Sequence, residues 1–331
     1  MERKILVTGG AGYIGSFMVR NLKEKGYDVV ILDNLSCGHE EAVKDFRLEK
    51  IDLVTDTEKL NSLFEKEKFD AVIHMASFIQ MGESYVNPSK YYFNNVVGFL
   101  NLMEAMRKGN CKKIVLSSSA GVYGNPERLP VDENDSKDPL NSYGETKYIM
   151  ERILEDYDTA YGIKFVALRY FNAAGGAIDG SIGEAHPEES HLIPSIIVKA
   201  IKGEEIEIFG EDYETPDGTC IRDYVHVLDL VEAHSLSLEF LEKGKSEVFN
   251  MGIGRGYSNK EVIEMVKKVT GLNLKVKYGP RREGDANSLY ASNVKIKDVL
   301  GWIPKYDLGG IIKTAYQWHK NHLNGYGNIN S

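Results

Sequence analysis

The stretch VTGGAGYIG, from Val7 to Gly15, decides the fold of this chain. It closes an apolar run that predicts a first β-strand over 4–8, and it opens a helical stretch over 13–25. Gly9, Gly12 and Gly15 permit a tight turn and a close approach of the backbone, and the start of the helix presents free N–H groups to a diphosphate. The stretch therefore predicts a dinucleotide-binding turn.

Strand-like and helical runs alternate through the first half of the chain. Short apolar strands separated by helices are typical of a parallel sheet buried on both faces. We expect strands over 4–8, 28–32, 46–51, 71–74, 113–117 and 165–169, and helices over 13–25, 57–67, 88–108 and 143–161. The pattern predicts an α/β fold with a doubly wound parallel (Rossmann) sheet, followed by a smaller α/β substrate-binding domain.

Bulk composition excludes several classes of protein. A chain of 331 residues with 42% apolar content is long enough for two domains, and its net charge of -9 argues against nucleic acid as a partner. No run approaches 18 apolar residues and no leader is recognisable, so we expect a cytoplasmic protein without a membrane partner. The three cysteines, Cys37, Cys111 and Cys220, lack metal-binding or disulfide spacing, and we expect no metal.

Asp33 ends the second expected strand and indicates which dinucleotide binds. A carboxylate there can accept hydrogen bonds from the adenosine ribose, and it would repel a 2′-phosphate. No Arg or Lys occurs over 34–38, so NAD is favoured over NADP. Asp52 follows the third strand, where it could meet the adenine amino group or only form a turn.

Tyr143 and Lys147 stand one helical turn apart and point to hydride chemistry on a hydroxyl group. Their spacing alone decides nothing, because Tyr316 and Lys320 repeat it near the C-terminus. A tyrosine has an ordinary pKa of about 10, so we expect Lys147 and a positive nicotinamide ring to favour its phenolate. Ser119, at the end of the fifth strand, could hydrogen-bond the same substrate hydroxyl or only cap a loop.

Together with longer motifs, these residues mark a family. The chain resembles the extended short-chain dehydrogenase/reductase family and, within it, the enzymes that epimerise UDP-hexoses at C4. The resemblance covers nearly the whole chain and rests on GGAGYIG (9–15), DNLSCG (33–38), GES (82–84), YYFNNV (91–96), SSSAGVYG (117–124), SYGETK (142–147), RYFNAAG (169–175), FGEDYETPDGTCIRDYVHV (209–227) and RREGD (281–285).

The resemblance implies a reaction and a set of roles. The family passes a hydride from the sugar C4 to NAD, rotates the 4-keto sugar and returns the hydride to the opposite face. The resemblance implies that Tyr143 removes the proton of the 4-hydroxyl, that Lys147 tunes the tyrosine, and that Ser119 orients the hydroxyl. The implied cofactor-binding residues are Gly9, Gly12, Tyr13, Ile14, Gly15, Asp33, Asn34, Ser36, Gly38, Asp52, Leu53, Met75, Ala76, Ser77, Asn94, Ser117, Tyr143, Lys147, Tyr170 and Phe171.

A second set of positions resembles the family's UDP-sugar contacts, among them arginines suited to a diphosphate. These are Ser119, Asn172, His191, Leu192, Phe209, Arg222, Tyr224, Arg282, Asp285 and Leu289. We expect residues 1–171 to form the NAD-binding domain, with 223–256 returning to it, and residues 172–222 and 257–331 to bind the nucleotide sugar. Relatives that pair two long helices into a bundle imply a homodimer, through the helices that contain 92–106 and 148–157.

Two positions differ from the family pattern. Ile79 stands where several members carry a lysine that touches the cofactor ribose, which could weaken NAD retention. Leu289 is of intermediate size at a position that lines the sugar pocket, so acceptance of N-acetylated UDP-hexosamines is an open hypothesis.

The same residues bear on alternative functions. Nucleotide-sugar 4,6-dehydratases need an adjacent Asp and Glu where this chain has Ala120 and Gly121, which argues against dehydration. UDP-glucuronate 4-epimerases or decarboxylases stay open, because one basic residue near the sugar C6 would suffice. A non-catalytic NAD sensor also stays open, although it need not retain Ser119, Tyr143 and Lys147.

Overall fold

The structure is a computed structural model that describes residues 3–186, 189–281 and 286–327. The chain divides into two compact units. The first consists of Met1–Gly124, Lys137–Arg169 and Val231–Phe249. The second consists of Asn125–Ser136, Tyr170–Leu230 and Asn250–Ser331.

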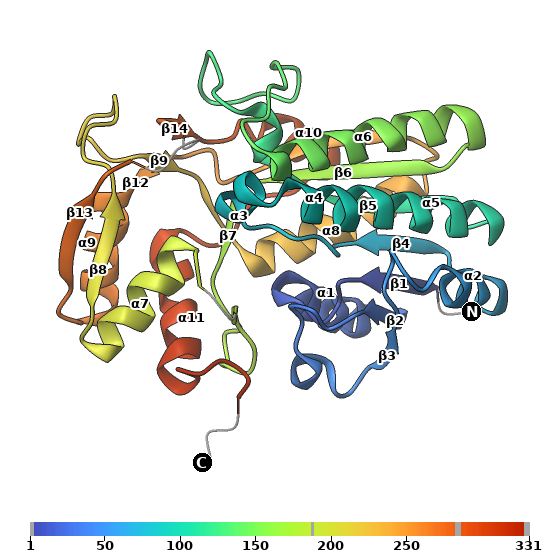
Figure 1. Cartoon of the computed structure of the whole chain (residues 1–331), viewed down its shortest axis with the longest axis horizontal. Coiled ribbons are helices and arrows are strands. Elements are labelled where there is room, and N and C mark those ends of the chain that lie inside the picture. Colours follow the sequence, from blue (N-terminus) through green and yellow to red (C-terminus); the bar gives the residue numbers. More distant parts are fainter. Residues whose placement is uncertain (1–2, 187–188, 282–285, 328–331) are drawn as a thin grey trace. The chain divides into compact units, whose positions relative to one another are not determined.

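A seven-stranded sheet forms the centre of the first unit (Figure 1). Its order is β11-β6-β5-β4-β1-β2-β3, and the pairs β1/β2, β1/β4, β2/β3 and β4/β5 are parallel. The strands are β1 (Lys4–Thr8), β2 (Asp28–Asp33), β3 (Arg47–Lys50), β4 (Ala71–His74), β5 (Lys113–Ser119), β6 (Lys164–Tyr170) and β11 (Glu247–Met251). The predicted doubly wound fold is confirmed, and the strand order reverses between β1 and β4, where such sheets bind ligands.

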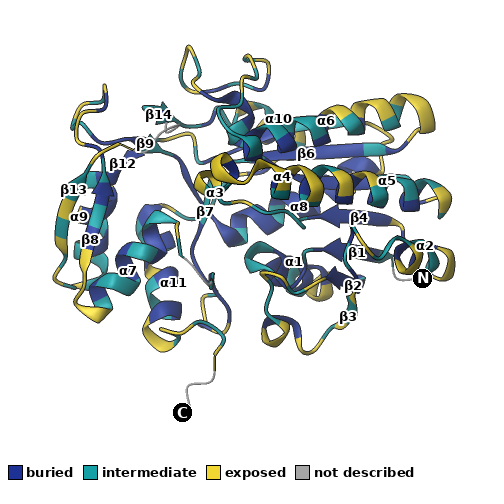
Figure 2. Ribbon diagram, viewed as in Figure 1, coloured by how far each residue is buried: buried dark blue, intermediate teal, exposed yellow. Residues whose placement is uncertain are grey.

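Helices cover both faces of this sheet. Side chains of α2 (Thr57–Lys66), α5 (Gly98–Lys108) and α6 (Ser142–Tyr161) share one apolar core with alternate residues of β1, β2, β4, β5 and β6. On the opposite face, His234 of α8 (Val227–Leu241) bonds Ser117, and Ser235 of α8 bonds Asn21 of α1 (Tyr13–Glu24). The strands β1, β2, β4, β5 and β6 are accordingly buried from both sides (Figure 2), as their apolar sequences predict, whereas β3 is half-buried or exposed.

The run expected as one helix over 88–108 has three parts. It consists of α4 (Pro88–Tyr91), a π-helical turn η2 (Tyr92–Val97) and α5, preceded by the short α3 (Met81–Val86). Within η2 the buried Asn95 accepts from Phe78 N–H at 2.9 Å and donates to Thr146 Oγ1 at 3.1 Å. The amide thereby ties the turn to α6, a contact that helical periodicity does not reveal. The short 3-10 helices η1 (Glu40–Val43) and η3 (Ala120–Tyr123) lie in loops.

In the part of the second unit that the structure describes, small sheets pack with four helices. Its strands pair as β7 (Asn172–Ala174) with β10 (Tyr224–His226), β8 (Glu205–Phe209) with β13 (Lys275–Gly279), and β9 (Ile221–Arg222) with β12 (Tyr257–Ser258) and β14 (Ser288–Leu289). The helices are α7 (Leu192–Lys202), α9 (Asn259–Thr270), α10 (Val294–Leu300) and α11 (Leu308–Asn321). Apolar residues of α7, α9 and α11 build its core around Ile197, Val266 and Ile312. Among the helices that the structure describes, none has the length and apolar character of a membrane span.

Candidate active site

The glycine-rich turn is built so tightly that two of its residues have no room for a side chain. Gly9 adopts a φ of +71°, and a Cβ there would lie 2.6 Å from the backbone nitrogen of Ala76. A Cβ on Gly15 would lie 2.2 Å from the carbonyl oxygen of Gly9. The turn therefore brings the start of α1 against the end of β1, with Gly12 at the N-cap of the helix.

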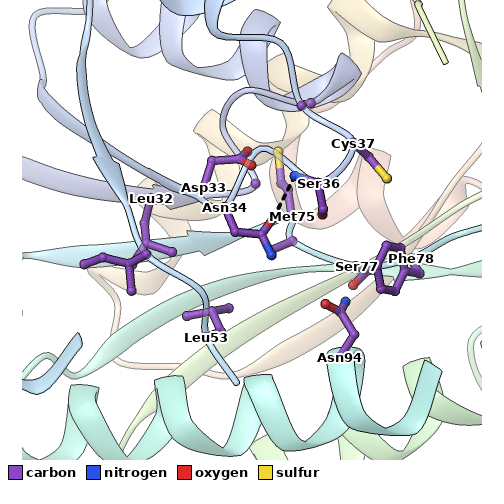
Figure 3. Close-up of a pocket in the computed structure, with 15 residues that line it drawn as sticks. Leu32, Asp33, Asn34, Ser36, Cys37, Leu53, Met75, Ser77, Phe78 and Asn94 are labelled. Carbon is purple, nitrogen blue, oxygen red and sulfur yellow. Dashed lines mark hydrogen bonds between the residues drawn. The ribbon is translucent and has the colours of Figure 1, made fainter. Parts of the chain in front are cut away.

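A pocket opens beside this turn (Figure 3). Residues at the end of β2 line one part of it, and Ser77, Phe78 and Asn94 line another. Its complete lining is Gly9, Gly12, Leu32, Asp33, Asn34, Ser36, Cys37, Gly38, Ile51, Leu53, Met75, Ala76, Ser77, Phe78 and Asn94. Eleven of these had been predicted as cofactor-binding residues, whereas Leu32, Cys37, Ile51 and Phe78 had not. Leu32 and Ile51 adjoin predicted residues at the carboxyl ends of β2 and β3, so strand position was the available signal.

Asp33 lies in this pocket with its carboxylate fixed by the backbone. Its Oδ2 accepts from the N–H of Ala11 at 2.9 Å, and its Oδ1 accepts from the N–H of Leu35 at 2.8 Å. Burial raises the pKa of this carboxyl, and the hydrogen bonds from the two backbone N–H groups lower it by less. A held carboxylate beside a glycine turn that has no room for a Cβ at Gly9 or Gly15 fits the ribose and the diphosphate of NAD.

Asp52 forms a turn. Its Oδ1 accepts from the N–H groups of Val54 and Thr55, and its Oδ2 accepts from the side-chain amide of Asn34 at 2.7 Å. These contacts agree with the turn-forming alternative, and they link the loops that follow β2 and β3. Asp52 is not among the residues that line the pocket.

Three predicted catalytic residues gather at the carboxyl end of β5. Asn141 caps α6 by accepting from Gly144 N–H at 2.9 Å, which places Tyr143 in the first turn of the helix. Lys147 donates from Nζ to the Ser117 carbonyl at 2.7 Å and to the Ser77 hydroxyl at 2.8 Å.

Ser119 contacts both a loop and the tyrosine. Its Oγ accepts from the N–H of Gly121 at 3.0 Å, so it does cap η3, and it also hydrogen-bonds Tyr143. A Cβ on Gly121 would lie 3.3 Å from Ser119 Oγ and 3.9 Å from Tyr143 Cε1. A larger acidic side chain at this position, as in the dehydratases, would crowd these two groups.

Burial governs the pKa values of the two titratable groups of this site. Burial lowers the pKa of Lys147 to about 7, although Glu151 raises it. Burial raises the pKa of Tyr143, and the hydrogen bond with Ser119 lowers it. The expectation that Lys147 and a positive nicotinamide ring together favour the phenolate stays a prediction. In the protein alone burial outweighs that influence, because both groups lie away from water.

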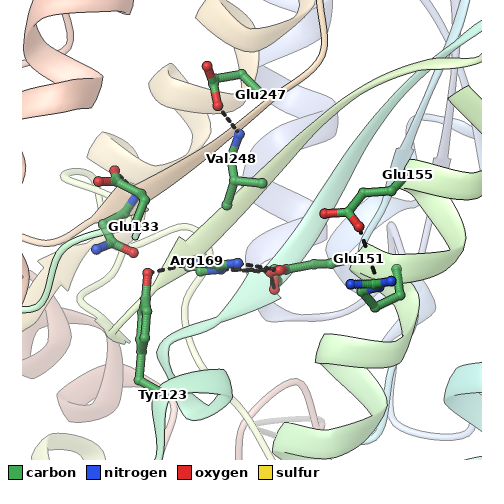
Figure 4. Close-up of polar contacts among 10 residues, drawn as sticks. Tyr123, Glu133, Glu151, Glu155, Arg169, Glu247 and Val248 are labelled. Atoms are coloured by element: carbon green, nitrogen blue, oxygen red, sulfur yellow. Dashed lines mark hydrogen bonds and ion pairs between the residues drawn. The ribbon is translucent and has the colours of Figure 1, made fainter. Parts of the chain in front are cut away.

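A buried ion pair that sequence reasoning missed lies one turn beyond Lys147 (Figure 4). Arg169 of β6 binds Glu151 of α6 through Nε and Nη2, with a closest distance of 2.5 Å, and donates from Nη1 to the Tyr123 hydroxyl at 2.8 Å. Ser118 donates to Glu151 Oε1 at 2.5 Å. The available signal was a carboxylate four residues after Lys147 together with an arginine in an apolar strand.

The predicted substrate residues of the second unit fall into two groups. Strand pairing aligns Asn172 with Tyr224 and Arg222 with Leu289, and Arg222 Nη1 donates to the Ala286 carbonyl at 2.8 Å. The other group consists of His191 and Leu192 at the start of α7 and Phe209 at the end of β8. Arg282 and Asp285 lie outside the described residues.

The remaining predicted cofactor residues do not line the pocket. Tyr13, Ile14 and Gly15 form the first turn of α1. Tyr170 ends β6, and the buried Phe171 follows it. Ile79, where several family members carry lysine, is 38% exposed. Roles for these residues stay predictions.

Known proteins resemble the chain over nearly its full length. Residues 5–252 match the model of the NAD dependent epimerase/dehydratase family. A UDP-glucose 4-epimerase of Lactobacillus helveticus is 49% identical over 98% of this chain and 99% of its own. The structure of a UDP-glucose 4-epimerase from Brucella ovis in complex with NAD has a TM-score of 0.91 at 44% identity, covering 95% of this chain and 97% of its own. The UDP-Glc/GlcNAc 4-epimerase of Campylobacter jejuni has a TM-score of 0.84 at 42% identity, covering 96% and 99%.

Proposed function

The chain belongs to the NAD dependent epimerase/dehydratase family, and we propose that it interconverts UDP-galactose and UDP-glucose, with NAD as its cofactor. One observation of the structure carries the proposal. Ser119, Tyr143 and Lys147 come together at the carboxyl end of β5, in the same unit as the pocket of the glycine-rich turn. Hydroxyl, phenol and ammonium are the groups needed to move one proton at a sugar alcohol.

In the proposed mechanism Tyr143 exchanges a proton with the sugar. Its phenolate oxygen takes the proton of the 4-hydroxyl and gives it back to the 4-keto intermediate after the sugar has turned, so no net proton is consumed. Ser119 orients the hydroxyl through its Oγ, which a backbone N–H already holds. Bound NAD would accept a hydride from C4 of the sugar and later return it to the same carbon.

The chain's own groups prepare the phenol for this task. Lys147 is fixed by two hydrogen bonds and carries a pKa of about 7, close to the working pH of a proton relay. Gly9, Gly12 and Gly38 leave room for a diphosphate, and Asp33 is placed to accept from the ribose. We propose that Asn172, Arg222, Tyr224 and Leu289 contact the UDP-sugar.

The experiment is incubation of purified protein with UDP-galactose without added reductant, with UDP-glucose followed by chromatography. Appearance of UDP-glucose supports the proposal, and no conversion refutes it. UDP-glucuronate and UDP-N-acetylglucosamine are tested in parallel. No conversion of UDP-N-acetylglucosamine would remove the idea that Leu289 leaves room for an N-acetyl group, and conversion of UDP-glucuronate alone would favour the uronate alternative.

We further propose a homodimer in the cytoplasm. The support for dimerisation is an apolar surface on the run from η2 into α5, where Tyr92, Phe93, Val97 and Leu100 are between 37% and 60% exposed. Large side chains so exposed at neighbouring helical positions are typical of a protein interface.

A further inference from the structure

Two histidines and two glutamates converge in the loop before α7, a part of the molecule that the proton relay does not use. Glu184, His186, Glu189 and His191 each offer one ligand atom, and these four atoms lie within 4.8 Å of one another. The Glu184 side chain is 2% exposed and pairs with both histidines. Buried carboxylates require a partner of opposite charge.

Two of the separations between these ligand atoms match those around one small cation. A tetrahedral ion with ligand bonds of about 2.1 Å separates its ligand atoms by roughly 3.4 Å. His186 Nδ1 lies 3.4 Å from Glu184 Oε1 and 3.3 Å from Glu189 Oε2, and His191 Nδ1 lies 4.0 Å from Glu189 Oε1. His191 Nδ1 also makes a direct contact with Glu184 Oε1. An ion bound between these two atoms would increase the distance between them.

We propose that Glu184, His186, Glu189 and His191 bind a single Zn²⁺. Two imidazoles and two carboxylates offer both nitrogen and oxygen ligands. Zn²⁺ accepts such a mixed set, whereas Mg²⁺ and Ca²⁺ prefer oxygen ligands alone. The two carboxylates neutralise a divalent ion when both imidazoles are neutral. The net charge of the occupied site is then zero without a proton added to either histidine.

Neighbouring groups already hold this set in place. The backbone N–H of His191 donates to Glu189 Oε1 at 2.8 Å, and the indole of Trp318 donates to the Glu184 carbonyl at 2.9 Å. Outer contacts of this kind fix the orientation of metal ligands. Because His191 is the N-cap residue of α7, the ion would tie the loop to the helix and stabilise both.

The test is metal binding by the untagged full chain after treatment with EDTA. Isothermal titration with ZnCl₂ is expected to show one equivalent, and Co²⁺ is expected to give the intense visible absorption of a tetrahedral site. Glu184→Gln and His186→Ala should each weaken Zn²⁺ binding by more than about tenfold. His39→Ala removes a histidine elsewhere, and Cys37→Ser removes the exposed thiol; both should bind as the wild type does.

Either of two results overturns the proposal. The first is no stoichiometric Zn²⁺ or Co²⁺ binding by the wild type, which would leave the four side chains as ion pairs only. The second is binding that Cys37→Ser abolishes and His186→Ala retains. Circular dichroism shows whether each variant folds. If Glu184→Gln does not fold, the Co²⁺ spectrum of the wild type still shows whether a tetrahedral metal site exists.

Discussion

The ammonium of Lys147 donates a hydrogen bond of 2.8 Å to the hydroxyl of Ser77, three residues beyond the end of β4. The same ammonium donates to the carbonyl of Ser117 in β5. One side chain of α6 thus joins the carboxyl ends of two neighbouring strands beside the reversal of the sheet. Lys147 is therefore a structural tie as well as a candidate catalytic group, and its two contributions can be measured apart.

Lys147 should make the ligand-free protein more stable as pH rises above 7. Its pKa is about 7 in the folded chain against the ordinary 10.5, so between these values the unfolded chain binds more protons. The free energy of unfolding then increases with pH across that window, by a few kcal/mol at about 1.36 kcal/mol per unit. Urea unfolding from pH 6 to 10 should show this rise in the wild type and not in Lys147→Met. Parallel curves for the two proteins would contradict it.

Tyr143→Phe should lower turnover of UDP-galactose about 10²- to 10⁴-fold, because it removes the proposed acid and base while keeping the ring. NAD content should stay the same. Tyr316→Phe is the matched control, because Tyr316 and Lys320 repeat the spacing in α11. Turnover is measured with UDP-galactose at saturation. Equal activity in wild type and Tyr143→Phe would remove Tyr143 from the mechanism.

Glu151→Gln should both destabilise the fold and alter the chemistry. Breaking a buried ion pair costs about 3–5 kcal/mol, because the Arg169 charge loses its partner. Glu151 also raises the pKa of Lys147, so its removal should lower that pKa further and shift the pH profile of kcat to lower pH. The double variant Glu151→Met with Arg169→Met should recover most of the stability that Glu151→Gln loses. Its pH profile of kcat should stay shifted to lower pH. A profile that does not move would make Glu151 purely structural.

Asp33 should select NAD against NADP. Replacing it with Ala in combination with Asn34→Arg removes a carboxylate that would repel the 2′-phosphate and adds a cation near it. Fluorescence titration is expected to show weaker NAD binding and at least tenfold better relative binding of NADP. Asp45→Ala, which changes an acidic residue outside the pocket, serves as the control. An unchanged preference would place the specificity elsewhere.

Phe93→Glu should favour the monomer if the exposed face of η2 and α5 pairs two copies, because Phe93 is 60% exposed and charge opposes apolar burial. Sedimentation velocity of wild type and variant at several concentrations measures this. Ile178→Glu, another large exposed side chain at 63%, provides the comparison. A wild type that is monomeric at all concentrations would refute the homodimer.

The sequence predicted best where local pattern and tertiary environment agree. The strands at Lys4–Thr8 and Ala71–His74 have the expected bounds, because apolar runs between turns leave few alternatives. Asn95 illustrates the limit: its amide bonds the backbone of a residue 17 positions away, and this contact accompanies a π turn that no periodicity indicates.

The candidate site divides in the same way. Residues carried by a motif, such as Gly9 and Asp33, were predicted because the turn itself dictates them. Glu151 and Arg169 were missed, since a charge pair becomes visible only when a helix and a strand far apart in sequence face each other. The rise in the pKa of Tyr143 that burial causes is hidden from the sequence for a related reason, because burial depends on the whole fold.

The separation of 2.2 Å between a Cβ on residue 15 and the Gly9 carbonyl has a practical consequence for mutagenesis. Even alanine at position 15 must push the first helix off its strand, so a loss of dinucleotide affinity there would report a displaced backbone and not a missing ligand contact. Variants meant to probe recognition belong at side chains that line the pocket, and even at Asp33 a substitution takes the partner from the N–H groups of Ala11 and Leu35.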